Sequence, residues 1–254
     1  MKQSRSVVNS RRERILETLR QNGNVNVKEL AAQLQVSHLT IRRDLQYLED
    51  HKQLERFYGG ARCGAAGGVW DEKNKIQLCR EKIARYAASL VADGDSIFIN
   101  TSATALGIVK YITAKNVTVI TNNGNIIGED NPSQATVVLL GGELRYMKGA
   151  MVGEFALNNL GRVTAKKSFV GCSGVSPDTG MTTELLNEVN INAKMFHRVT
   201  GSSYILADHT KLGKKSSFVS CPASEIANII TDREAPRHVV EEFREKGIEV
   251  FQVD

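Results

Sequence analysis

The chain has 254 residues, of which 41% are hydrophobic, and this is enough apolar material for the cores of one or two domains. The sequence contains no apolar stretch of bilayer-spanning length and nothing that resembles a secretion signal, so we expect a soluble cytoplasmic protein. The net charge of +5 is confined to residues 1–62, which hold 12 Lys and Arg against 7 Asp and Glu, whereas residues 63–254 hold 21 of each. A basic excess in one short segment suits binding to a phosphate backbone, although an ordinary solvated surface would give the same count.

Residues 11–62 predict three helices followed by a short hairpin. Apolar side chains recur at helical spacing in Arg11–Gln21, and a second helix is expected at about Val27–Leu34. After a short break, a third helix is expected at about His38–His51. Two helices joined by so short a turn form a helix-turn-helix, and the extended pieces on either side of residues 59–60 predict a β-wing. The segment is therefore predicted to be a winged helix-turn-helix.

The third predicted helix carries the side chains best suited to reading DNA. Its apolar residues face the small core, so the polar residues of its first turns are left exposed, after an N-cap at Ser37. A helix in the major groove contacts base edges with those turns, and arginine binds guanine bidentately or clamps a phosphate. We expect Asp44 to orient one of the arginines. The candidate DNA-binding residues, the last two in the wing, are Ser37, His38, Thr40, Arg42, Arg43, Arg56 and Arg62.

Small residues dominate positions 63–71, which are predicted to be a linker between a DNA-binding domain at 1–62 and an α/β domain at 72–254. The cysteines are widely spaced and form no Cys-x-x-Cys pair, and none has a histidine at metal-ligand spacing. They are Cys63, Cys79, Cys172 and Cys221. We expect reduced thiols, with neither a metal site nor a cofactor.

After a helix at about Glu72–Val91, short apolar runs alternate with helical segments. Most runs lack polar alternation, as expected for strands that helices cover on both faces. This alternation predicts a mainly parallel, doubly wound α/β sheet. The predicted strands are Ser96–Ile99, Val117–Ile120, Val137–Leu140, Ser168–Val170, Tyr204–Ala207, Ile226–Ile230 and Ile248–Phe251.

Polar or glycine-rich loops follow the first three of these strands and predict a ligand site. Residues 101–104 precede a helix expected at Ala105–Tyr111, where free N–H groups and hydroxyls suit an anion, although simple capping by Ser102 or Thr104 would leave the same pattern. Ligands of open α/β sheets bind beyond the carboxyl ends of the strands, so we expect the three loops to converge there. The candidate effector-binding residues are Asn100, Thr101, Ser102, Thr104, Asn122, Gly141, Gly142 and Lys211, the last supplying a positive charge.

The N-terminal pattern reads S-H-L-T-I-R-R-D-L at residues 37–45 and L-E-R-F-Y-G-G-A at residues 54–61. With the apolar spacing of residues 27–36, it closely resembles the DNA-binding domain of the DeoR family, bacterial repressors named after the deoxyribose operon repressor. The resemblance covers residues 11–62 almost without gaps. It implies a regulator that binds an operator in duplex DNA as a homo-oligomer, at least a dimer.

The resemblance continues to the C-terminus. Motifs that look like the family's sensor domain are K-I-A at 82–84, D-G-D at 93–95, T-V-I-T-N at 118–122, L-G-G-E at 140–143, G-M-T-T at 180–183, A-D-H-T-K at 207–211 and I-T-D at 230–232. That domain is related in fold to ribose-5-phosphate isomerase and the glucosamine-phosphate isomerases. The resemblance implies a repressor of sugar or sugar-acid catabolism that a phosphorylated sugar or a related anionic metabolite releases from its operator.

Two segments depart from the family's pattern. Where the family commonly has Asp-x-Gly-Thr/Ser-Thr, residues 100–104 read N-T-S-A-T, and the usual Asp-Ser-Ser/Thr-Lys reads D-H-T-K at residues 208–211. Both changes fall where the resemblance places the ligand. Because an amide at Asn100 tolerates a negative group that an aspartate would repel, a sugar acid or acid phosphate is favoured over a neutral sugar.

Two other function classes fit parts of the sequence. A sugar-phosphate isomerase with an appended DNA-binding module would use acid, base and electrostatic groups drawn from Glu188, Asp208, His209 and Lys211, although Asn100 is an amide and cannot act as a general base. An RNA-binding or nonspecific nucleic-acid-binding protein would share the basic segment. The helix-plus-wing pattern disfavours this second class, because a reading helix suits the DNA major groove better than the narrow groove of RNA. We therefore expect a regulator and not an enzyme.

Overall fold

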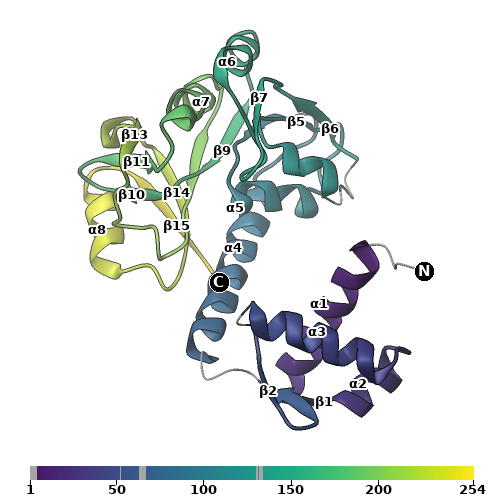
Figure 1. Ribbon diagram of the computed structural model, residues 1–254. Helices are drawn as coiled ribbons and strands as arrows, with labels where there is room; N and C mark the ends of the chain where they lie inside the picture. The colour runs from purple at the N-terminus through teal and green to yellow at the C-terminus, as the bar shows by residue number, and fades with distance from the viewer. Residues whose placement is uncertain (1–4, 52, 63–66, 130, 132–133) are drawn as a thin grey trace. The chain divides into compact units, whose positions relative to one another are not determined.

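Helices α1, α2 and α3 and a small sheet build the first of the two units into which the chain divides, Met1–Lys75 and Ile76–Asp254 (Figure 1). The computed structural model describes residues 5–51, 53–62, 67–129, 131 and 134–254. In the first unit the elements are α1 (Arg5–Asn22), β1 (Asn24–Asn26), α2 (Val27–Gln33), α3 (His38–Asp50), β2 (Glu55–Phe57) and β3 (Gly60–Arg62). The strands form an antiparallel sheet in the order β1-β3-β2.

Side-chain caps fix the starts of both short helices in the first unit. The Asn26 side chain accepts from the Lys28 N–H at 2.8 Å to start α2, and Ser37 Oγ accepts from the Thr40 N–H at 3.2 Å to start α3. Between the two helices Gln35 has a φ of 52°, which turns the chain sharply. The predicted helix-turn-helix and wing are confirmed. The core of this unit includes Ile15, Leu19, Leu30, Ile41, Leu45 and Leu48.

A parallel sheet in the order β15-β14-β12-β9-β4-β5-β6 forms the centre of the second unit. Each of its seven strands overlaps one of the predicted apolar runs, so the mainly parallel sheet is confirmed. The strands are β4 (Ser96–Ile99), β5 (Thr118–Thr121), β6 (Thr136–Leu139), β9 (Lys167–Gly171), β12 (Ser203–Leu206), β14 (Asn228–Asp232) and β15 (Glu249–Val253).

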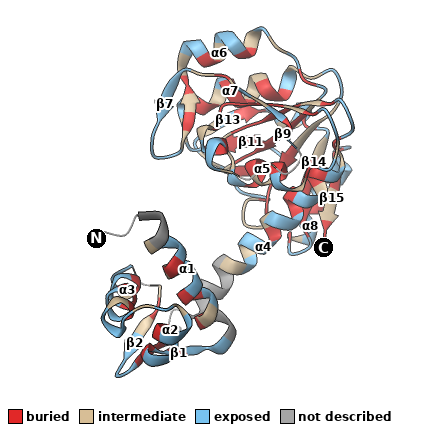
Figure 2. Cartoon of the chain, turned by 90° about the vertical axis from the view of Figure 1, so that its right-hand side faces the viewer, coloured by how far each residue is buried: buried red, intermediate tan, exposed pale blue. Residues whose placement is uncertain are grey.

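Helices cover both faces of this sheet, as the doubly wound prediction requires. One apolar cluster joins Ile97 and Ile99 to α4 (Gly67–Ser89), α5 (Ala103–Leu106) and the 3-10 helix η1 (Gly107–Tyr111). A second cluster joins Phe98, on the opposite face, to three later helices, because successive side chains of a strand point to opposite sides. These helices are α6 (Gly153–Gly161), α7 (Leu186–His197) and α8 (Arg237–Glu245). Figure 2 shows the buried residues gathered on the central strands and on the helix faces against them.

Two small antiparallel sheets and two further 3-10 helices lie beside the main sheet and were not predicted. One sheet has the order β10-β11-β13, and the other is the hairpin β7-β8. The elements are β7 (Glu143–Arg145), β8 (Ala150–Val152), β10 (Gly174–Ser176), β11 (Gly180–Thr183), β13 (Phe218–Cys221), η2 (Gly124–Gly128) and η3 (Ala223–Glu225).

The predicted linker, residues 63–71, differs in part from what the structure contains. Residues 63–66 lie outside the described residues, and the remainder is helical because α4 begins at Gly67. The domain boundaries at 62 and 72 therefore stay a prediction. Within the described residues, no helix combines the length and the apolar composition needed to cross a membrane.

Candidate functional site

The first candidate site is the exposed face of α3. Ser37, His38, Arg42 and Arg43 are exposed and Thr40 is half-buried, whereas Ile41, Leu45 and Leu48 are buried in the core. Ser37 Oγ and Thr40 Oγ1 lie 2.9 Å apart, so the capping residue also holds the Thr40 hydroxyl. Within the described part of the chain, neither Arg42 nor Arg43 has a side-chain hydrogen bond or ion pair. Both guanidinium groups are thus exposed on the first turns of the helix.

The sequence suggested that Asp44 orients one of these arginines, but it orients neither of them. Its buried carboxylate accepts from Arg11 Nε at 2.6 Å and from Arg12 Nε at 3.0 Å. Both partners belong to α1, and the Arg12 guanidinium also lies 3.5 Å from the centroid of the Tyr47 ring on α3. Asp44 sits on the buried side of α3, so it faces α1 while Arg42 and Arg43 face outward. Its role is to join the two helices.

The two predicted wing arginines are both bonded to neighbouring side chains. Arg56 donates to the Gln46 side chain and lies 3.7 Å from a Glu49 carboxylate oxygen, and Arg62 Nε lies 3.3 Å from Glu55 Oε2. Between the wing strands the chain turns at Gly59, where φ is 96°. Sequence reasoning missed the aromatic tip beside this turn, although the F-Y-G-G run was visible: Phe57 and Tyr58 are both exposed. The wing therefore offers aromatic surface as well as charge.

A polar cleft of about 470 Å³ is the second candidate site, and it lies within the second unit. Its walls include residues 100–104, which follow β4, and residues 171–173, which follow β9. The chain runs from β4 outward through β5 to β6, then returns so that β9 pairs with the other edge of β4. This reversal of strand order is the place where open α/β sheets bind ligands.

Asn100 uses its whole amide to hold the two loops together at the base of the cleft. Its Nδ2 donates to the Gly171 carbonyl at 2.8 Å and to Asn192 Oδ1 at 3.0 Å. Its Oδ1 accepts from the Gly171 N–H at 3.0 Å and from the Ser102 N–H at 3.2 Å. The side chain is only 2% exposed. The amide therefore positions the loops that a ligand would contact.

Glu188 brings a buried carboxylate to the cleft, which the sequence-based site did not include. Its two oxygens accept from Thr101 Oγ1 at 3.0 Å and from Thr183 Oγ1 at 2.9 Å. Glu184 also lines the cleft and is exposed. These carboxylates are suited to accept hydrogen bonds from ligand hydroxyls, and they offset part of the positive charge around them.

The turn after β4 is a weaker anion site than its sequence suggested. The expected helix at Ala105–Tyr111 is a single α-turn, Ala103–Leu106, that continues as the 3-10 helix η1. Ser102 Oγ accepts from the Ala105 N–H at 3.5 Å, and the Thr104 side chain is buried. A helix this short has a small dipole. Attraction for an anion must therefore come from the side-chain charges of the cleft.

Those positive charges are Arg80, Lys148 and Lys211. Arg80 Nε donates to Asp208 Oδ2 at 2.8 Å, whereas Lys211 has no side-chain hydrogen bond or ion pair within the described residues. Burial raises the pKa of Asp208, but hydrogen bonds from Thr210 and Arg80 and the charges of Arg80 and Lys211 outweigh burial and hold it below its ordinary value. Asp208 therefore stays ionised and fixes Arg80 at the cleft.

Five of the eight predicted effector residues line this cleft, and three lie outside it. The five are Asn100, Thr101, Ser102, Thr104 and Lys211. Asn122 instead donates from Nδ2 to the Met151 carbonyl at 3.0 Å, which ties the end of β5 to β8. Gly141 and Gly142 follow β6 at the sheet edge, and a Cβ on Gly142 would lie 2.5 Å from the Val152 carbonyl oxygen. Loops after β5 and β6 lie progressively farther from β4, so these residues serve the packing there.

The groups that an isomerase would need belong to separate hydrogen-bonded sets. Asp208 bonds Arg80 and Thr210, and His209 bonds Asp232. Of Glu188, Asp208, His209 and Lys211, only Glu188 and Lys211 line the cleft. The cleft is a ligand-sized space lined by side chains of both charges.

Comparison with known proteins matches both units. The description "DeoR-like helix-turn-helix domain" fits residues 11–64, and "DeoR C terminal sensor domain" fits residues 77–233. The lactose phosphotransferase system repressor of Staphylococcus aureus (strain N315) is 30% identical over 232 residues, which cover 88% of this chain and 92% of that repressor. The HTH-type transcriptional repressor GlcR of Bacillus subtilis (strain 168) is 32% identical over 231 residues, which cover 86% of each chain.

A solved structure of ribose 5-phosphate isomerase A from Methanocaldococcus jannaschii aligns with a TM-score of 0.37 and 16% sequence identity. The alignment covers 53% of this chain and 54% of the isomerase.

Proposed function

The chain belongs to the DeoR family of transcriptional repressors, and we propose that it represses an operon of sugar or sugar-acid catabolism. In this proposal α3 binds the operator, and a phosphorylated sugar or related anionic metabolite binds the sensor cleft and releases the protein from DNA. The S. aureus relative is named as the repressor of a lactose phosphotransferase system, and lactose is a sugar. We place the protein in the cytoplasm, where a regulator of chromosomal genes acts.

The observation that carries the DNA part is the exposed N-terminal half of α3. Arg42 and Arg43 project from a helix whose other face is fixed in the core, so both guanidinium groups are free to reach base edges or phosphates. We propose Ser37, His38, Thr40, Arg42, Arg43, Arg56 and Arg62 as the DNA-contacting set. Arg56 and Arg62 must exchange their bonds to Glu49 and Glu55 for phosphates, so their contribution is the smaller one.

The operator can be obtained by selecting duplexes from a random pool with the purified protein. Arg42→Ala and Arg43→Ala should then weaken specific binding by about 1–3 kcal/mol each if they contact bases. Arg237→Ala, at an exposed arginine on α8 in the other unit, is the matched control and should bind like wild type. Wild-type affinity in both α3 variants, with unchanged circular dichroism, would contradict the assignment.

The proposed effector combines an anionic group with hydroxyls. Arg80, Lys148 and Lys211 offer positive charge for a phosphate or carboxylate, while Glu184 and Glu188 offer acceptors for hydroxyl groups. Asn122, Gly141 and Gly142 are not part of the site proposed here, because they do not line the cleft.

A panel of sugar phosphates and sugar acids should include compounds that raise the melting temperature, since a ligand of the native state stabilises it by mass action. Lys211→Ala should abolish that shift and the ligand-driven release from DNA, while operator binding stays intact. Lys214→Ala, an exposed lysine three positions on that does not line the cleft, is the control and should respond normally. A normal response from Lys211→Ala would rule this site out.

A further inference from the structure

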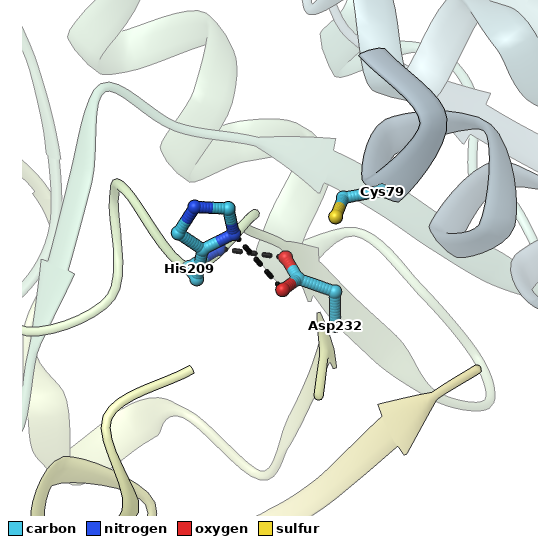
Figure 3. Close-up of side chains that lie close together, drawn as sticks. All are labelled: Cys79, His209 and Asp232. Atoms are coloured by element: carbon cyan, nitrogen blue, oxygen red, sulfur yellow. Dashed lines mark hydrogen bonds and ion pairs between the residues drawn. The ribbon is translucent and has the colours of Figure 1, made fainter. Parts of the chain in front are cut away.

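A cluster of three metal-ligand side chains lies in the sensor unit, outside the effector cleft. Cys79 comes from α4, His209 from the loop after β12, and Asp232 from the last position of β14. One ligand atom from each residue lies within 4.8 Å of the others. Figure 3 shows the Cys79 sulfur pointing toward the Asp232 carboxylate, with the His209 ring on the other side of that carboxylate.

The carboxylate at the centre of this cluster is almost fully buried. Asp232 is 2% exposed and Cys79 is 7% exposed. Asp232 accepts from His209 Nδ1 at 2.9 Å and from the backbone N–H groups of His209 at 2.8 Å and Glu234 at 3.0 Å. Within the described residues, His209 is its only ion-pair partner. Buried charges in proteins are normally paired or bound to a metal, and no lysine or arginine among the described residues forms an ion pair with this carboxylate.

We propose that Cys79, His209 and Asp232 bind a zinc-like divalent transition-metal ion. Thiolate sulfur, imidazole nitrogen and carboxylate oxygen form the donor set that Zn²⁺ takes, at roughly 2.0–2.3 Å from the ion. Ligand atoms around a tetrahedral zinc ion lie roughly 3–4 Å apart, so the three groups need only small side-chain movements to close on an ion. This site is independent of the proposed function and of the effector cleft.

The ion replaces interactions that the side chains now make with each other. Burial, then the charges of Asp232 and Glu234, raise the pKa of the Cys79 thiol to about 11, so the thiol is protonated at neutral pH. A divalent ion between the sulfur and the carboxylate reverses that electrostatic effect, and the thiol releases its proton on binding. The His209 side chain is 21% exposed, which leaves room for water as the fourth ligand.

The site joins three elements beside the cleft. Cys79 precedes Arg80, which lines the cleft, and His209 follows Asp208, which pairs with Arg80 at 2.8 Å. Sequence reasoning excluded a metal because it considered cysteine and histidine spacing along the chain. The three ligands are distant in sequence, and the parallel pairing of β12 with β14 brings two of them together.

A second cluster provides a control within the same chain. His197, Cys221 and Glu225 also place ligand atoms within 4.8 Å of one another, but His197 and Glu225 are exposed. His197 Nε2 already lies 3.0 Å from Glu225 Oε2 as a surface pair. Water competes more strongly for an ion at this exposed cluster, so we assign the metal to the buried one.

Titration of tag-free, reduced full-length protein with Co²⁺ tests the proposal directly. Co²⁺ bound by a thiolate gives a near-ultraviolet charge-transfer band, and tetrahedral geometry gives strong visible bands. Wild type and Cys221→Ser should both show these bands, and Zn²⁺ should displace Co²⁺ and remove them. Cys79→Ser should lose the charge-transfer band. His209→Ala, at a partly exposed side chain, should keep the fold and weaken Co²⁺ binding.

The following results would contradict the proposed metal site. Absence of a thiolate band in wild type, or its persistence in Cys79→Ser, would overturn the proposal. So would loss of the band in Cys221→Ser, which would move the metal to the exposed cluster. If Cys79→Ser does not fold, His209→Ala decides the matter, because wild-type Co²⁺ affinity in that folded variant is incompatible with the proposed ligand set.

Discussion

Asn100 shows how one residue type at the end of a strand organises a binding cleft. Its amide offers two donors to Gly171 O and Asn192 Oδ1 and accepts from two backbone N–H groups, so every polar atom is used. An aspartate would place a carboxylate oxygen against the Gly171 carbonyl oxygen at about the 2.8 Å that now separates donor and acceptor. Aspartate also lacks the hydrogen atoms that the amide donates.

Asn100→Asp should therefore lower the free energy of unfolding of the sensor unit by about 1–3 kcal/mol, the usual effect of leaving buried polar partners unsatisfied. Chemical denaturation followed by circular dichroism measures this loss. Asn125→Asp adds the same charge to the same cleft on an exposed side chain and should change stability little. Equal stability of the two variants would show that the Asn100 amide is not the link between the loops.

Asp208 makes the stability of the sensor unit depend on pH. Its pKa in the folded state lies below the ordinary value of about 3.9, so its stabilising contribution is present above that pH and is lost as the pH falls through the folded pKa. Arg80→Met removes one cause of the lowered pKa, and acidification from neutral pH should then cost the variant less stability than it costs wild type.

Denaturation midpoints at neutral pH and at a pH well below 4, where the contribution of Asp208 is being lost, measure this difference. Arg85→Met is the control on the same helix, because Arg85 lies over the Tyr111 ring, 4.6 Å from its centroid, and is absent from the interactions that shift Asp208. Its pH dependence should match wild type. The same loss of stability on acidification in Arg80→Met and wild type would mean that Arg80 does not lower the Asp208 pKa.

At the scale of elements, apolar runs predicted all seven strands of the main sheet, because the central strands are buried on both faces and the edge strands β6 and β15 still carry apolar side chains. The same criterion missed the antiparallel strands, because it depends on apolar runs. Gly180–Thr183 and Glu143–Arg145 carry glycine, threonine or charged residues, with no apolar run to mark them. Short polar strands of this kind depend on partners that are distant in sequence.

Strand order explains why only some of the predicted effector residues line the cleft. Sequence position suggested that the loops after β4, β5 and β6 would meet, since these strands are consecutive. The order instead places β9 beside β4, which brings Gly171–Ser173 to the cleft and leaves Gly141 and Gly142 at the edge. Arg80 and Glu188 arrive on α4 and α7, and no local pattern indicates which strand end a helix will approach.

The packing of α3 against α1 depends on a buried ion pair. Asp44 accepts from Arg11, whose side chain is 9% exposed, and from the more exposed Arg12. Asp44→Ala should destabilise the first unit by about 3 kcal/mol, because it removes the buried carboxylate that bonds the Arg11 and Arg12 guanidinium groups. Operator binding should fall with the folded fraction, while effector binding by the sensor unit is unchanged.

Circular dichroism at helical wavelengths measures this loss of stability. Asp50→Ala removes an exposed carboxylate from the same helix, where it accepts only from Gln46 at 2.9 Å among the described bonds, and should change stability by less than about 0.5 kcal/mol. A stable Asp44→Ala variant would show that Arg11 and Arg12 hold the helices by other contacts.

At the scale of the whole molecule, the two units have separate cores. The first core draws on residues between Ile15 and Ala61, and the two clusters of the second unit draw on residues between Ile83 and Val253. Because no buried cluster among the described residues mixes the two sets, each unit has the apolar burial it needs to fold independently.

The surface of the second unit carries the larger share of exposed apolar side chains. Tyr146 and Met147 in the β7-β8 hairpin, Phe155 on α6 and Leu186 on α7 are all exposed. Exposed apolar side chains that lie together in one patch mark surfaces that associate with another chain, and these four are the candidates for such a patch. Paired half-sites in DNA also call for a symmetric dimer, since one winged helix covers few base pairs. We therefore expect the second unit to hold at least a dimer together.

A fragment containing residues 76–254 should fold, keep the oligomeric state of the full-length chain and lose operator binding, because its core, its cleft and its exposed apolar surface all lie within that range. Light scattering on both proteins at equal concentration measures the oligomer, and thermal shift with a responsive anion measures the cleft. Full-length protein with Phe155→Glu tests the surface further and should dissociate if α6 lies in the interface. A folded, monomeric fragment beside a dimeric full-length chain would place the interface in the first unit instead.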